Sequence, residues 1–440
     1  MTNVLSKEQE HAYSEYKKRG NVFITGPGGS GKSELIKTIF KDAIQNILKI
    51  KVTALTGCAA FLLECKATTV HSFFGIGISM NATIEELAKK ALSKSKVKNQ
   101  IKELDVLIVD EVSMMSAKLF NLLNLIAQKA RKNNLFFGGI QIIFSGDFFQ
   151  LPPIGNNTYT QAFCFESTIW DAVFRVQIEL KTIFRQKNKE YIKILNQIRK
   201  GKISKNSYET LLKHVGRTFL GDIASKPTKL FPLRTMVDSV NTAELGALEG
   251  NEFIYKLEEV SFYNSLYTLE EIKKEQKFLL NSVSCENELK LKIGCQVICI
   301  INIDLDNESP LCNGSAGRVM KIDELSGYPF VKFSNGNEVL IEPHSFISEN
   351  INTVSIKQLP LILAYSVSIH RSQGTGFEAA EIDIGSNVFE NGQSYVALSR
   401  VKDLNGLYIT SLDITKIKAN PKVLMYYETH FEEKKSAQKK

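Results

Sequence analysis

The sequence of 440 residues contains no CxxC pair, and its seven cysteines are an odd number scattered along the chain. A disulfide framework needs paired cysteines and a zinc ribbon needs closely spaced ones, so neither is expected. Cys58, Cys164 and Cys299 stand among apolar neighbours, which is typical of small core residues in a reducing compartment. The cysteines therefore argue against a small secreted fold.

Long apolar runs are lacking as well. No run approaches the roughly 18–20 residues that cross a bilayer, and the polar start of the chain, MTNVLSKEQEHAYSEY, has no signal-peptide core. We expect a soluble intracellular protein without a membrane role. With 43% hydrophobic and 23% charged residues the chain is ordinary globular material, and its length allows several domains. The net charge of +8 permits an anionic partner without requiring one.

Short apolar runs alternate with helical patterns in the first part of the chain. The runs are rich in β-branched residues, and Met115, Leu119, Leu122 and Ile126 recur at helical spacing before the last of them. Apolar strands that alternate with helices predict a parallel sheet covered on both faces. We therefore predict an α/β fold, with one doubly wound domain over residues 1–165 and strands at 21–25, 51–55, 106–109 and 141–144.

The middle of the chain is rich in β patterns. Two Asn-Gly turns, at 313–314 and 335–336, lie between apolar runs at 293–303, 318–322, 328–333 and 338–341. Such turns are strong hairpin signals, so residues 255–350 are expected to form a small inserted all-β subdomain. The α/β pattern then returns at 361–367, 381–384 and 407–410, which predicts a second α/β region from residues 166–250 and 355–425.

Two charged segments are set apart from these patterns. An insertion near residues 80–103 carries lysines and no acidic residue over positions 89–102. It is interpreted either as a solvated helix face or as an element that faces phosphates, and both interpretations stay open. Residues 432–440, EEKKSAQKK, form a charged tail that is expected to be disordered. The lysines of the insertion are Lys89, Lys90, Lys94, Lys96, Lys98 and Lys102.

A glycine-rich segment after the first strand carries the strongest single motif. It reads GPGGSGKS, fits GxxxxGK[ST], and has a helical pattern after it, as a phosphate-binding loop requires. Backbone N–H groups of such a loop and the following helix N-terminus bind phosphate oxygens. Lys32 would contact the terminal phosphates of a nucleotide, and Ser33 would ligate Mg²⁺. The cofactor-binding residues expected here are Gly26, Gly28, Gly29, Ser30, Gly31, Lys32 and Ser33.

Acidic and amide side chains follow two later strands. Asp110 and Glu111 end the run VLIV, and the carboxyl edge of a parallel strand faces the phosphate crevice. Asp110 would hold the Mg²⁺ shell, and Glu111 would orient or deprotonate an attacking water. Gln150, after the fourth strand, could donate to a γ-phosphate oxygen, although a lone polar loop residue is more often structural. A second carboxylate suits hydrolysis better than transfer of phosphate to a metabolite.

Taken in order, these segments resemble the Pif family of DNA helicases within superfamily I. The resemblance runs from about Leu5 to Thr410. Segments similar to the family are LSKEQ (5–9), GPGGSGKS (26–33), TALTGCAA (53–60), TTVHSFFGIG (68–77), VDEVSMM (109–115), FGGIQIIFSGDFFQLPP (137–153), IFRQ (183–186), SVSIHRSQG (366–374) and SYVALSRV (394–401). A phosphate loop alone fits many ATPases, but this series of motifs in this order is highly specific.

The resemblance implies two RecA-like domains with ATP between them and an SH3-like subdomain inserted in the second. It implies that Gln9 reads the adenine, and that Arg185 and Arg400, from the second domain, reach the γ-phosphate, where a guanidinium stabilises charge in the transition state. Gln373 and Gly374 would join a strand contact to the ATP cleft. No second GxxxxGK[ST] occurs in the chain, which suits a motor with one complete nucleotide site.

Candidate contacts to nucleic acid occur in both halves. A glycine with small neighbours lets backbone N–H groups approach a phosphate, and histidine, hydroxyl and aromatic groups can bind a phosphate or stack a base. The candidates are Thr56, Gly57, His71, Ser72, Phe73, His370, Arg371 and Ser372. A tight core turn at Gly57 and a core position for His71 are equally open, and at least one of Phe73 and Phe74 is expected in the core. Contacts to the strand backbone predict sequence-tolerant, salt-sensitive binding.

Two positions depart from the family pattern. The family usually has lysine where Arg371 stands, and arginine keeps the charge with a different donor geometry. The family also usually has threonine at the second position after the motif glycine, where this chain has Gly376 and places Thr375 one residue earlier. The departures put one phosphate contact in doubt but leave the nucleotide site untouched.

The resulting hypothesis is an ATP- and Mg²⁺-dependent DNA helicase. It would move along single-stranded DNA, with the 5′-to-3′ direction implied by the resemblance only, and would unwind forked duplex DNA in replication, repair or recombination. It would act as a monomer wherever the DNA is: in the cytoplasm of a prokaryote, or in a nucleus, an organelle or a viral site. The alternatives are a P-loop kinase or ATPase acting on a small molecule, a DNA-binding ATP switch without unwinding, and the motor subunit of a recombination nuclease.

Overall fold

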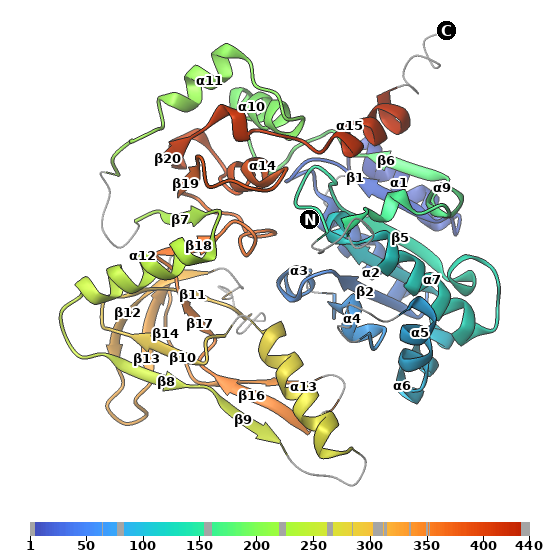
Figure 1. Ribbon diagram of the computed structural model, residues 1–440, viewed down its shortest axis with the longest axis horizontal. Coiled ribbons are helices and arrows are strands. Elements are labelled where there is room, and N and C mark those ends of the chain that lie inside the picture. The colour runs from blue at the N-terminus through green and yellow to red at the C-terminus, as the bar shows by residue number, and fades with distance from the viewer. Residues whose placement is uncertain are drawn as a thin grey trace. The chain divides into compact units, whose positions relative to one another are not determined.

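The computed structural model describes residues 5–63, 65–76, 83–153, 161–219, 226–261, 267–283, 285–301, 311, 315–333, 336–348, 351 and 353–432. The chain divides into two compact units (Figure 1). Unit 1 consists of Met1–Lys213, Ile384–Asn405 and Leu412–Lys440, and unit 2 of His214–Asp383 and Gly406–Ser411. The boundaries expected from the sequence for two α/β regions and an insertion stay a prediction.

Unit 1 is built on a six-stranded sheet in the order β3-β2-β4-β5-β1-β6. Each neighbouring pair in this sheet is parallel, which confirms the expected α/β class. All four strands expected in the first 165 residues are present, and β6 adds a fifth long strand beside β1. The strands are β1 (Val22–Thr25), β2 (Ile50–Ala54), β3 (Thr68–Thr69), β4 (Val106–Asp110), β5 (Gln141–Ser145) and β6 (Val176–Glu179).

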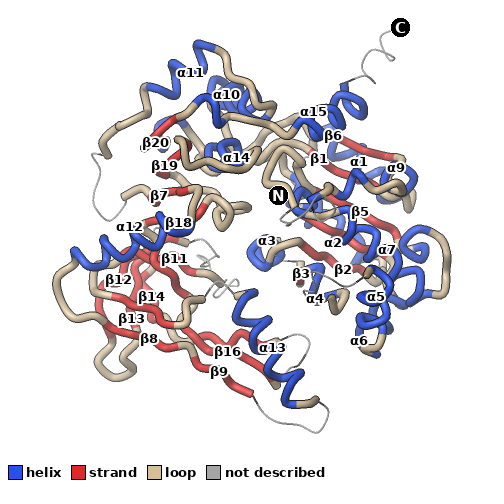
Figure 2. Tube along the Cα trace, in the orientation of Figure 1, coloured by secondary structure: helices blue, strands red, loops and turns tan. Residues whose placement is uncertain are grey.

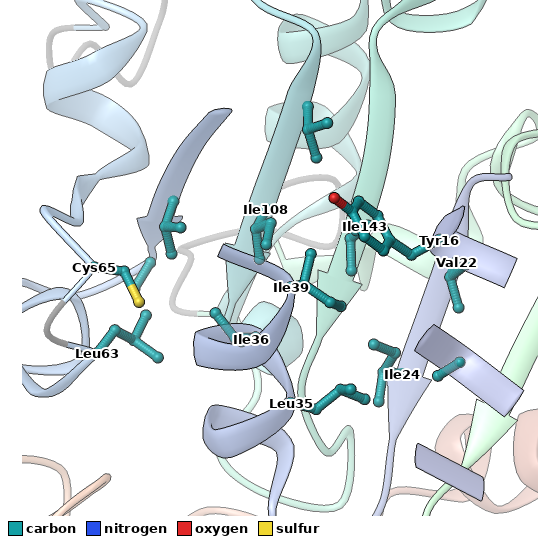
Figure 3. Packing of buried hydrophobic residues seen from close by; sticks show 14 of the residues in the cluster. Tyr16, Val22, Ile24, Leu35, Ile36, Ile39, Leu63, Cys65, Ile108 and Ile143 are labelled. Carbon is teal, nitrogen blue, oxygen red and sulfur yellow. The ribbon is translucent and has the colours of Figure 1, made fainter. Parts of the chain in front are cut away.

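Alternate residues of these strands face two different cores. On one face Val22 and Ile24 pack with Ile143 against the helices α1 (Lys7–Lys17), α2 (Lys32–Gln45) and α3 (Gly57–Leu62) (Figure 3). On the other face Phe23 and Phe144 contact a cluster of aromatic rings from α7 (Ala117–Arg131) and α9 (Trp170–Val173). The period of two along a strand produces this division, and it leaves the carboxyl ends of the strands free for the loops that carry the site.

The remaining elements of unit 1 complete the surroundings of this sheet. The lysines of the insertion lie on α5, on α6 and, for Lys94, at the N-cap of α6, and all are exposed, whereas Val97 and Ile101 of α6 are buried. Both interpretations of these lysines therefore stay open. The elements are α4 (Val70–Phe73), α5 (Ile84–Leu92), α6 (Ser95–Glu103), η1 (Val112–Met114), η2 (Phe136–Gly139), η3 (Cys164–Glu166), α10 (Lys189–Arg199), α11 (Lys205–Leu212), α14 (Gln393–Ser399), η5 (Leu404–Gly406), η6 (Ile414–Lys416), α15 (Pro421–Tyr427) and the π-helix η7 (Glu428–Glu432).

Unit 2 contains a smaller sheet in the order β18-β7-β19-β20, in which β7 runs parallel to both β18 and β19. Asn241 of α12 (Arg234–Ala247) holds the start of β18, because its amide donates to Ser366 O at 3.1 Å and accepts from Ser366 N–H at 2.9 Å. The strands are β7 (Thr228–Phe231), β18 (Ser366–Ser368), β19 (Ala380–Ile384) and β20 (Leu407–Leu412).

The rest of unit 2 is rich in strands (Figure 2). They pair in antiparallel fashion, as the hairpin signals indicate. One sheet has the order β14-β13-β12-β11-β17 and another the order β15-β16-β9, so this region continues to Leu363, past residue 350. Residues 313, 314 and 335 of the two Asn-Gly turns lie outside the described residues. The elements are β8 (Phe253–Lys256), β9 (Glu258–Ser261), α13 (Leu269–Ser282), β10 (Glu288–Leu291), β11 (Gln296–Cys299), β12 (Ala316–Ile322), β13 (Pro329–Phe333), β14 (Glu338–Leu340), β15 (His344–Ile347), β16 (Val354–Gln358) and β17 (Leu361–Leu363).

The apolar run at 361–367 differs from its expected form. Its first part is β17, which pairs with β11 in the β-rich region, and its second part is β18, which pairs with β7 in the α/β sheet. The α/β pattern expected at 361–367 is thus seen only in the second part of the run, because the chain changes sheet at Ala364 and Tyr365, without a glycine or proline to mark the turn. None of the helices in the described ranges is long and apolar enough to cross a membrane. The expected tail lies outside the described residues from position 433 onward.

Candidate nucleotide-binding site

The phosphate loop joins β1 to α2 at the carboxyl edge of the sheet of unit 1. Gly29 has a φ of 82°, in the left-handed region that favours glycine. A β-carbon on Gly29 would lie 2.5 Å from Cβ of Arg185, so this position has room for glycine only. The buried hydroxyl of Ser30 has no hydrogen-bond partner within the described part of the chain. The loop is therefore shaped by close neighbours and keeps a polar group available to a ligand.

Lys32 opens α2 and folds back onto the loop. Its Nζ donates to Gly26 O at 2.7 Å and to Pro27 O at 3.1 Å. Burial lowers the pKa of Lys32, and the carboxylates of Asp147, Glu111 and Asp110 act in the opposite direction. A phosphate group would bring the negative charge that an ammonium in this position needs. Ser33 follows it and is exposed.

Two carboxylates lie next to the loop, as expected from the sequence. Asp110 is the last residue of β4 and is buried, and Glu111 has a left-handed backbone with φ 55° before η1. Burial and then the negative charge of Glu111 raise the pKa of Asp110 to about 6, while the Ser145 hydroxyl and the ammonium of Lys32 act against this rise. Two close carboxylates that repel each other form a site that a cation would stabilise.

Gln9 lies against the other side of the loop. Its Nε2 donates to Gly31 O at 3.0 Å, and its Oε1 accepts from Ser6 N–H at 2.8 Å in the capping box that begins α1. Both ends of the Gln9 amide are thus engaged, and the cap of α1 fixes the side chain next to the loop. The role of Gln9 in reading an adenine stays a prediction.

The two arginines expected to act on the γ-phosphate both lie at the loop within unit 1. Arg185 N–H points at Gly29 O at 3.4 Å, and Arg185 Nη1 donates to Ser399 O at 3.4 Å. A β-carbon placed on Gly28 would lie 3.5 Å from Nη2 of Arg400. Burial and then repulsion by Arg185 lower the pKa of Arg400 to about 10, so its guanidinium stays charged at neutral pH.

A second group of buried polar residues lies beside the loop and was missed by the sequence reasoning. Asp147 accepts from Nε of Arg199 at 3.0 Å and from Nη2 at 2.9 Å, and the hydroxyl of Tyr395 donates to Asp147 Oδ2 at 3.1 Å. Arg199 also donates to Glu179 at 3.1 Å. The only sequence signal for this group is the position of Asp147 within SGDFFQ. Gln150 is in the same loop and is buried, with its N–H donating to Asp147 O at 2.9 Å.

The DNA candidates of unit 1 take partly structural positions. The hydroxyl of Thr56 accepts from Ala59 N–H at 3.2 Å, and Gly57 is the first residue of α3. Burial lowers the pKa of His71, so it would meet a phosphate as a neutral hydrogen-bonding group. The backbone N–H of Ser72 donates a hydrogen bond to the Thr69 hydroxyl at 3.2 Å. Phe73 is only 7% exposed and packs edge-on against buried Phe74, which disfavours the predicted stacking of a base on Phe73.

The candidates of unit 2 follow β18 in one turn. Arg371 is exposed and lies near Glu286, whose pKa burial raises and Arg371 lowers. Ser372 is buried, with its hydroxyl donating to Ile369 O at 2.8 Å, and burial lowers the pKa of His370. Gln373 is buried and Gly374 has a φ of 85°. These residues share one turn, and their part in DNA or nucleotide binding stays a prediction.

The fold and this site define a P-loop nucleotide-binding protein with a parallel α/β core. The family model described as PIF1-like helicase matches residues 4–209, and the model for the 2B domain of DNA helicase Pif1 matches residues 278–322. The chain belongs to the PIF1-like helicase family.

Individual relatives agree with this assignment. The chain is 31% identical to the ATP-dependent DNA helicase Pif1 of Bdellovibrio bacteriovorus, over 96% of this chain and 92% of the relative. It is 32% identical to the ATP-dependent DNA helicase PIF1 of Emericella nidulans, over 95% of this chain and 62% of the relative. The crystal structure of Pif1 helicase from Candida albicans superposes with a TM-score of 0.83 at 33% identity, covering 97% of this chain and 99% of that one. The chain spans about three fifths of the length of several curated relatives.

The residues at the loop fit a nucleotide and a magnesium ion. Three kinds of group at the loop can donate to phosphate oxygens. They are the Ser30 hydroxyl, which has no hydrogen-bond partner among the described residues, the ammonium of Lys32, and the guanidinium groups of Arg185 and Arg400. The oxygen donors of Ser33 and Asp110 are the kind that Mg²⁺ prefers, and Mg²⁺ usually takes only one or two of them beside substrate phosphates. Within the described ranges no group of three or more His, Cys, Asp or Glu side chains could hold a metal ion.

Proposed function

We propose that the protein is an ATP-dependent DNA helicase that couples ATP hydrolysis to movement along single-stranded DNA and to separation of duplex DNA at a fork. The observation that carries the proposal is the approach of Arg185 and Arg400 to the phosphate loop that holds Lys32. The names of the relatives, ATP-dependent DNA helicases, support the same activity. DNA replication, repair or recombination is the setting that suits such an activity, wherever the DNA lies.

The chemistry of the site follows from charge. ATP would bind with its phosphates along residues 26–33, and Lys32 with the two arginines would stabilise negative charge that spreads over the phosphoryl oxygens. Glu111 would orient or deprotonate the attacking water, and Gln150 would hydrogen-bond the γ-phosphate. Mg²⁺, held by Ser33 and Asp110, would supply charge neutralisation at the phosphates.

Movement requires that DNA be gripped and released in step with ATP. Candidate contacts in unit 1 (Thr56, Gly57, His71 and Ser72) and in unit 2 (His370, Arg371 and Ser372) would bind the strand backbone, with Phe73 the weakest of the set because of its burial. Gln373 and Gly374 would link the contacts of unit 2 to the nucleotide. The proposal includes a monomer as the active form and 5′-to-3′ movement, which rests on the family resemblance; unwinding of duplexes with a 5′ or a 3′ tail tests the direction.

The first test is ATP turnover with and without single-stranded DNA. We expect turnover to rise with DNA, and Lys32→Ala to abolish it while DNA binding measured by fluorescence anisotropy is kept. Lys32 is the residue that brings positive charge to the terminal phosphates, so its loss removes chemistry rather than the DNA surface.

Other outcomes would contradict the proposal in distinct ways. ATP turnover that is the same with and without DNA would favour an ATPase or kinase acting on a small molecule. DNA binding with negligible turnover in the wild type would indicate an ATP switch. Unwinding retained by Lys32→Ala would show that the nucleotide site is misassigned. As a control, Lys37→Ala on α2 should leave turnover unchanged, because the partly exposed Lys37 pairs with the exposed Glu34 of the same helix at 3.7 Å.

A further inference from the structure

One tyrosine hydroxyl connects the phosphate loop with the buried ion pair beside it. Tyr395 Oη accepts a hydrogen bond from Gly28 N–H at 2.9 Å and donates one to Asp147 Oδ2 at 3.1 Å. Tyr395 is 2% exposed and Asp147 is fully buried. The hydroxyl therefore uses its donor and one acceptor position in a place that water does not reach, between two segments that carry the nucleotide chemistry.

The surroundings determine the direction of these bonds. Asp147 is held by two nitrogens of Arg199 and acts as an acceptor only, so the proton of the shared bond belongs to Tyr395. Burial and then the negative charge of Asp147 raise the pKa of Tyr395, so its hydroxyl stays protonated. Asp147 also accepts from the hydroxyl of Tyr427 at 3.3 Å. A chain of hydrogen bonds therefore connects the loop amide, through Tyr395 and Asp147, with Arg199 on α10, and Asp147 accepts from both sides.

Tyr395 and Arg400 lie close together along the chain. Tyr395 lies in α14, and Arg400 is the residue directly after that helix. The Arg400 guanidinium is held on the same helix, since Nε donates to Val396 O at 3.0 Å and Nη2 donates to the Ser399 hydroxyl at 2.8 Å. A β-carbon on Gly28 would lie 3.5 Å from both Arg400 Nη2 and the Ser399 hydroxyl. Gly28 thus meets α14 twice, at the hydroxyl of Tyr395 and at the guanidinium of Arg400.

We propose that Tyr395 is a positioning residue that ties α14, and with it Arg400, to Gly28 of the phosphate loop and to Asp147. The inference rests on the proposed ATP hydrolysis and deepens it, because it assigns the placement of one catalytic arginine to a group that does not itself touch the reacting atoms. Arg400 stabilises charge only when it stands at the right distance from the phosphate. Without the Tyr395 hydroxyl, α14 keeps its apolar packing but loses its directed bond to the loop.

Tyr191 of α10 offers a matched control, because its hydroxyl also binds α14. It is fully buried, and its hydroxyl donates to Leu398 O of α14 at 2.7 Å. Within the described part of the chain, no hydrogen bond joins Tyr191 to the phosphate loop. Tyr191→Phe and Tyr395→Phe each remove one buried hydroxyl from the surface of α14, so a merely structural role predicts similar effects for both.

The experiment compares these two variants in the full chain. Tyr395→Phe should lower kcat for DNA-stimulated ATP turnover by about 10- to 100-fold, the range that a misplaced catalytic group produces. Its affinity for the fluorescent nucleotide mant-ADP should stay within about twofold of the wild type, because ADP lacks the phosphate that Arg400 serves. Tyr191→Phe should leave kcat within about twofold. Unfolding in urea, followed by Trp170 fluorescence, should show similar losses for both variants.

A double variant identifies the route of the effect. If Tyr395 acts through Arg400, Tyr395→Phe combined with Arg400→Ala should be no slower than Arg400→Ala alone, since coupled residues are not additive. Additive losses would overturn the inference, and so would an unchanged kcat in Tyr395→Phe. Tighter mant-ADP binding by Tyr395→Phe would also overturn it, because the hydroxyl would then compete with phosphate for Gly28 N–H. A wild type without DNA-stimulated turnover would instead contradict the proposed function itself.

Discussion

The pair formed by Arg199 and Asp147 is the most buried ion pair described in unit 1. The side chain of Arg199 is 5% exposed and that of Asp147 is 0% exposed. Burial lowers the pKa of Arg199, but the charge of Asp147 outweighs this and raises it well above its usual value. The guanidinium also lies over the rings of Phe149 at 4.6 Å and Tyr427 at 5.1 Å. Removing Arg199 would leave the Asp147 carboxylate without its ion-pair partner in a buried place, whereas Arg199 has a second carboxylate partner in Glu179.

We therefore expect Arg199→Met to lower the free energy of unfolding by roughly 3–5 kcal/mol, the cost of breaking a buried pair on one side. Urea unfolding followed by fluorescence of Trp170, the only tryptophan in the chain, measures this in unit 1. Lys200→Ala is the neighbouring control, because Lys200 pairs with Glu432 while both side chains are 48% exposed. Its cost should be about 1 kcal/mol or less.

A third variant distinguishes the cost of an unpaired buried charge from the cost of lost side-chain packing. Adding Asp147→Asn to Arg199→Met removes the stranded carboxylate, so the double variant should regain part of the lost stability. Equal costs for Arg199→Met and Lys200→Ala would show that the pair contributes no more than a surface contact.

At this scale the sequence predicts the residues that lie at the phosphate loop better than those that support them. Lys32, Asp110 and Arg400 stand in motifs whose spacing along the chain is itself the signal. Asp147 and Arg199 are 52 positions apart, and Asp147 and Tyr395 are 248 apart. Such contacts depend on the packing of α10 and α14 beside the sheet, which no local pattern encodes. Burial of Phe73 is a second example, because an aromatic residue in a polar motif fits a core as well as a base.

Among the elements, α14 depends on one glycine at its start. Gly392 has a φ of 80°, and a β-carbon there would lie 2.4 Å from Phe149 O and 2.9 Å from Gln150 O. The helix thus begins in direct contact with the loop that contains Asp147 and Gln150. Gly139 offers a comparison in the same unit, with a φ of 78° but no atom closer than the end of the Asn133 side chain at 3.3 Å.

Gly392→Ala should destabilise unit 1 more than Gly139→Ala does. Both substitutions force alanine into a left-handed backbone, at a cost of about 1–2 kcal/mol. Gly392→Ala also has to displace α14 from the backbone of its neighbour, which adds about 1–3 kcal/mol. The same displacement should lower ATP turnover, whereas Gly139→Ala should keep it. Equal stability losses and equal turnover in the two variants would mean that α14 is not held at this contact.

Strands and helices of unit 1 were largely predictable, since buried parallel strands show continuous apolar runs with helical patterns between them. The exchange of sheets between β17 and β18 was not predictable, because the run at 361–367 is mostly buried and no turn residue separates its two parts. Local pattern specifies that a segment is extended and buried. Which neighbour it pairs with is decided by long-range contacts.

On the scale of the whole molecule, the candidate DNA contacts divide between the two units and consist mostly of neutral groups. Burial lowers the pKa of both His71 and His370, so neither adds positive charge at neutral pH. Arg371 is the charged member of the set, and it is exposed. The lysines of α6 are exposed as well and are the alternative source of charge. Affinity for a polyanion therefore depends on how many of these cations meet phosphates.

The salt dependence of DNA binding measures how many of those cations contact phosphates. The logarithm of the binding constant for single-stranded DNA should fall linearly with the logarithm of salt concentration, by about 0.7 for each phosphate neutralised, and should differ little between strands of different base sequence. Arg371→Gln should make this slope shallower by about 0.7, because it removes one phosphate contact. Fluorescence anisotropy between 50 and 200 mM KCl (on the order of the range in which such slopes are measured) gives the slope directly.

The same titration decides between the two interpretations of the lysine-rich insertion. Lys98→Gln combined with Lys102→Gln should make the slope shallower by about 1.4 if α6 faces phosphates, and should leave it unchanged if these lysines form a solvated face. An unchanged slope in Arg371→Gln would remove Arg371 from the DNA surface. Arg371→Lys provides the last comparison: it should restore the slope lost in Arg371→Gln, since the slope depends on the number of charges that meet phosphates and not on the shape of the charged group.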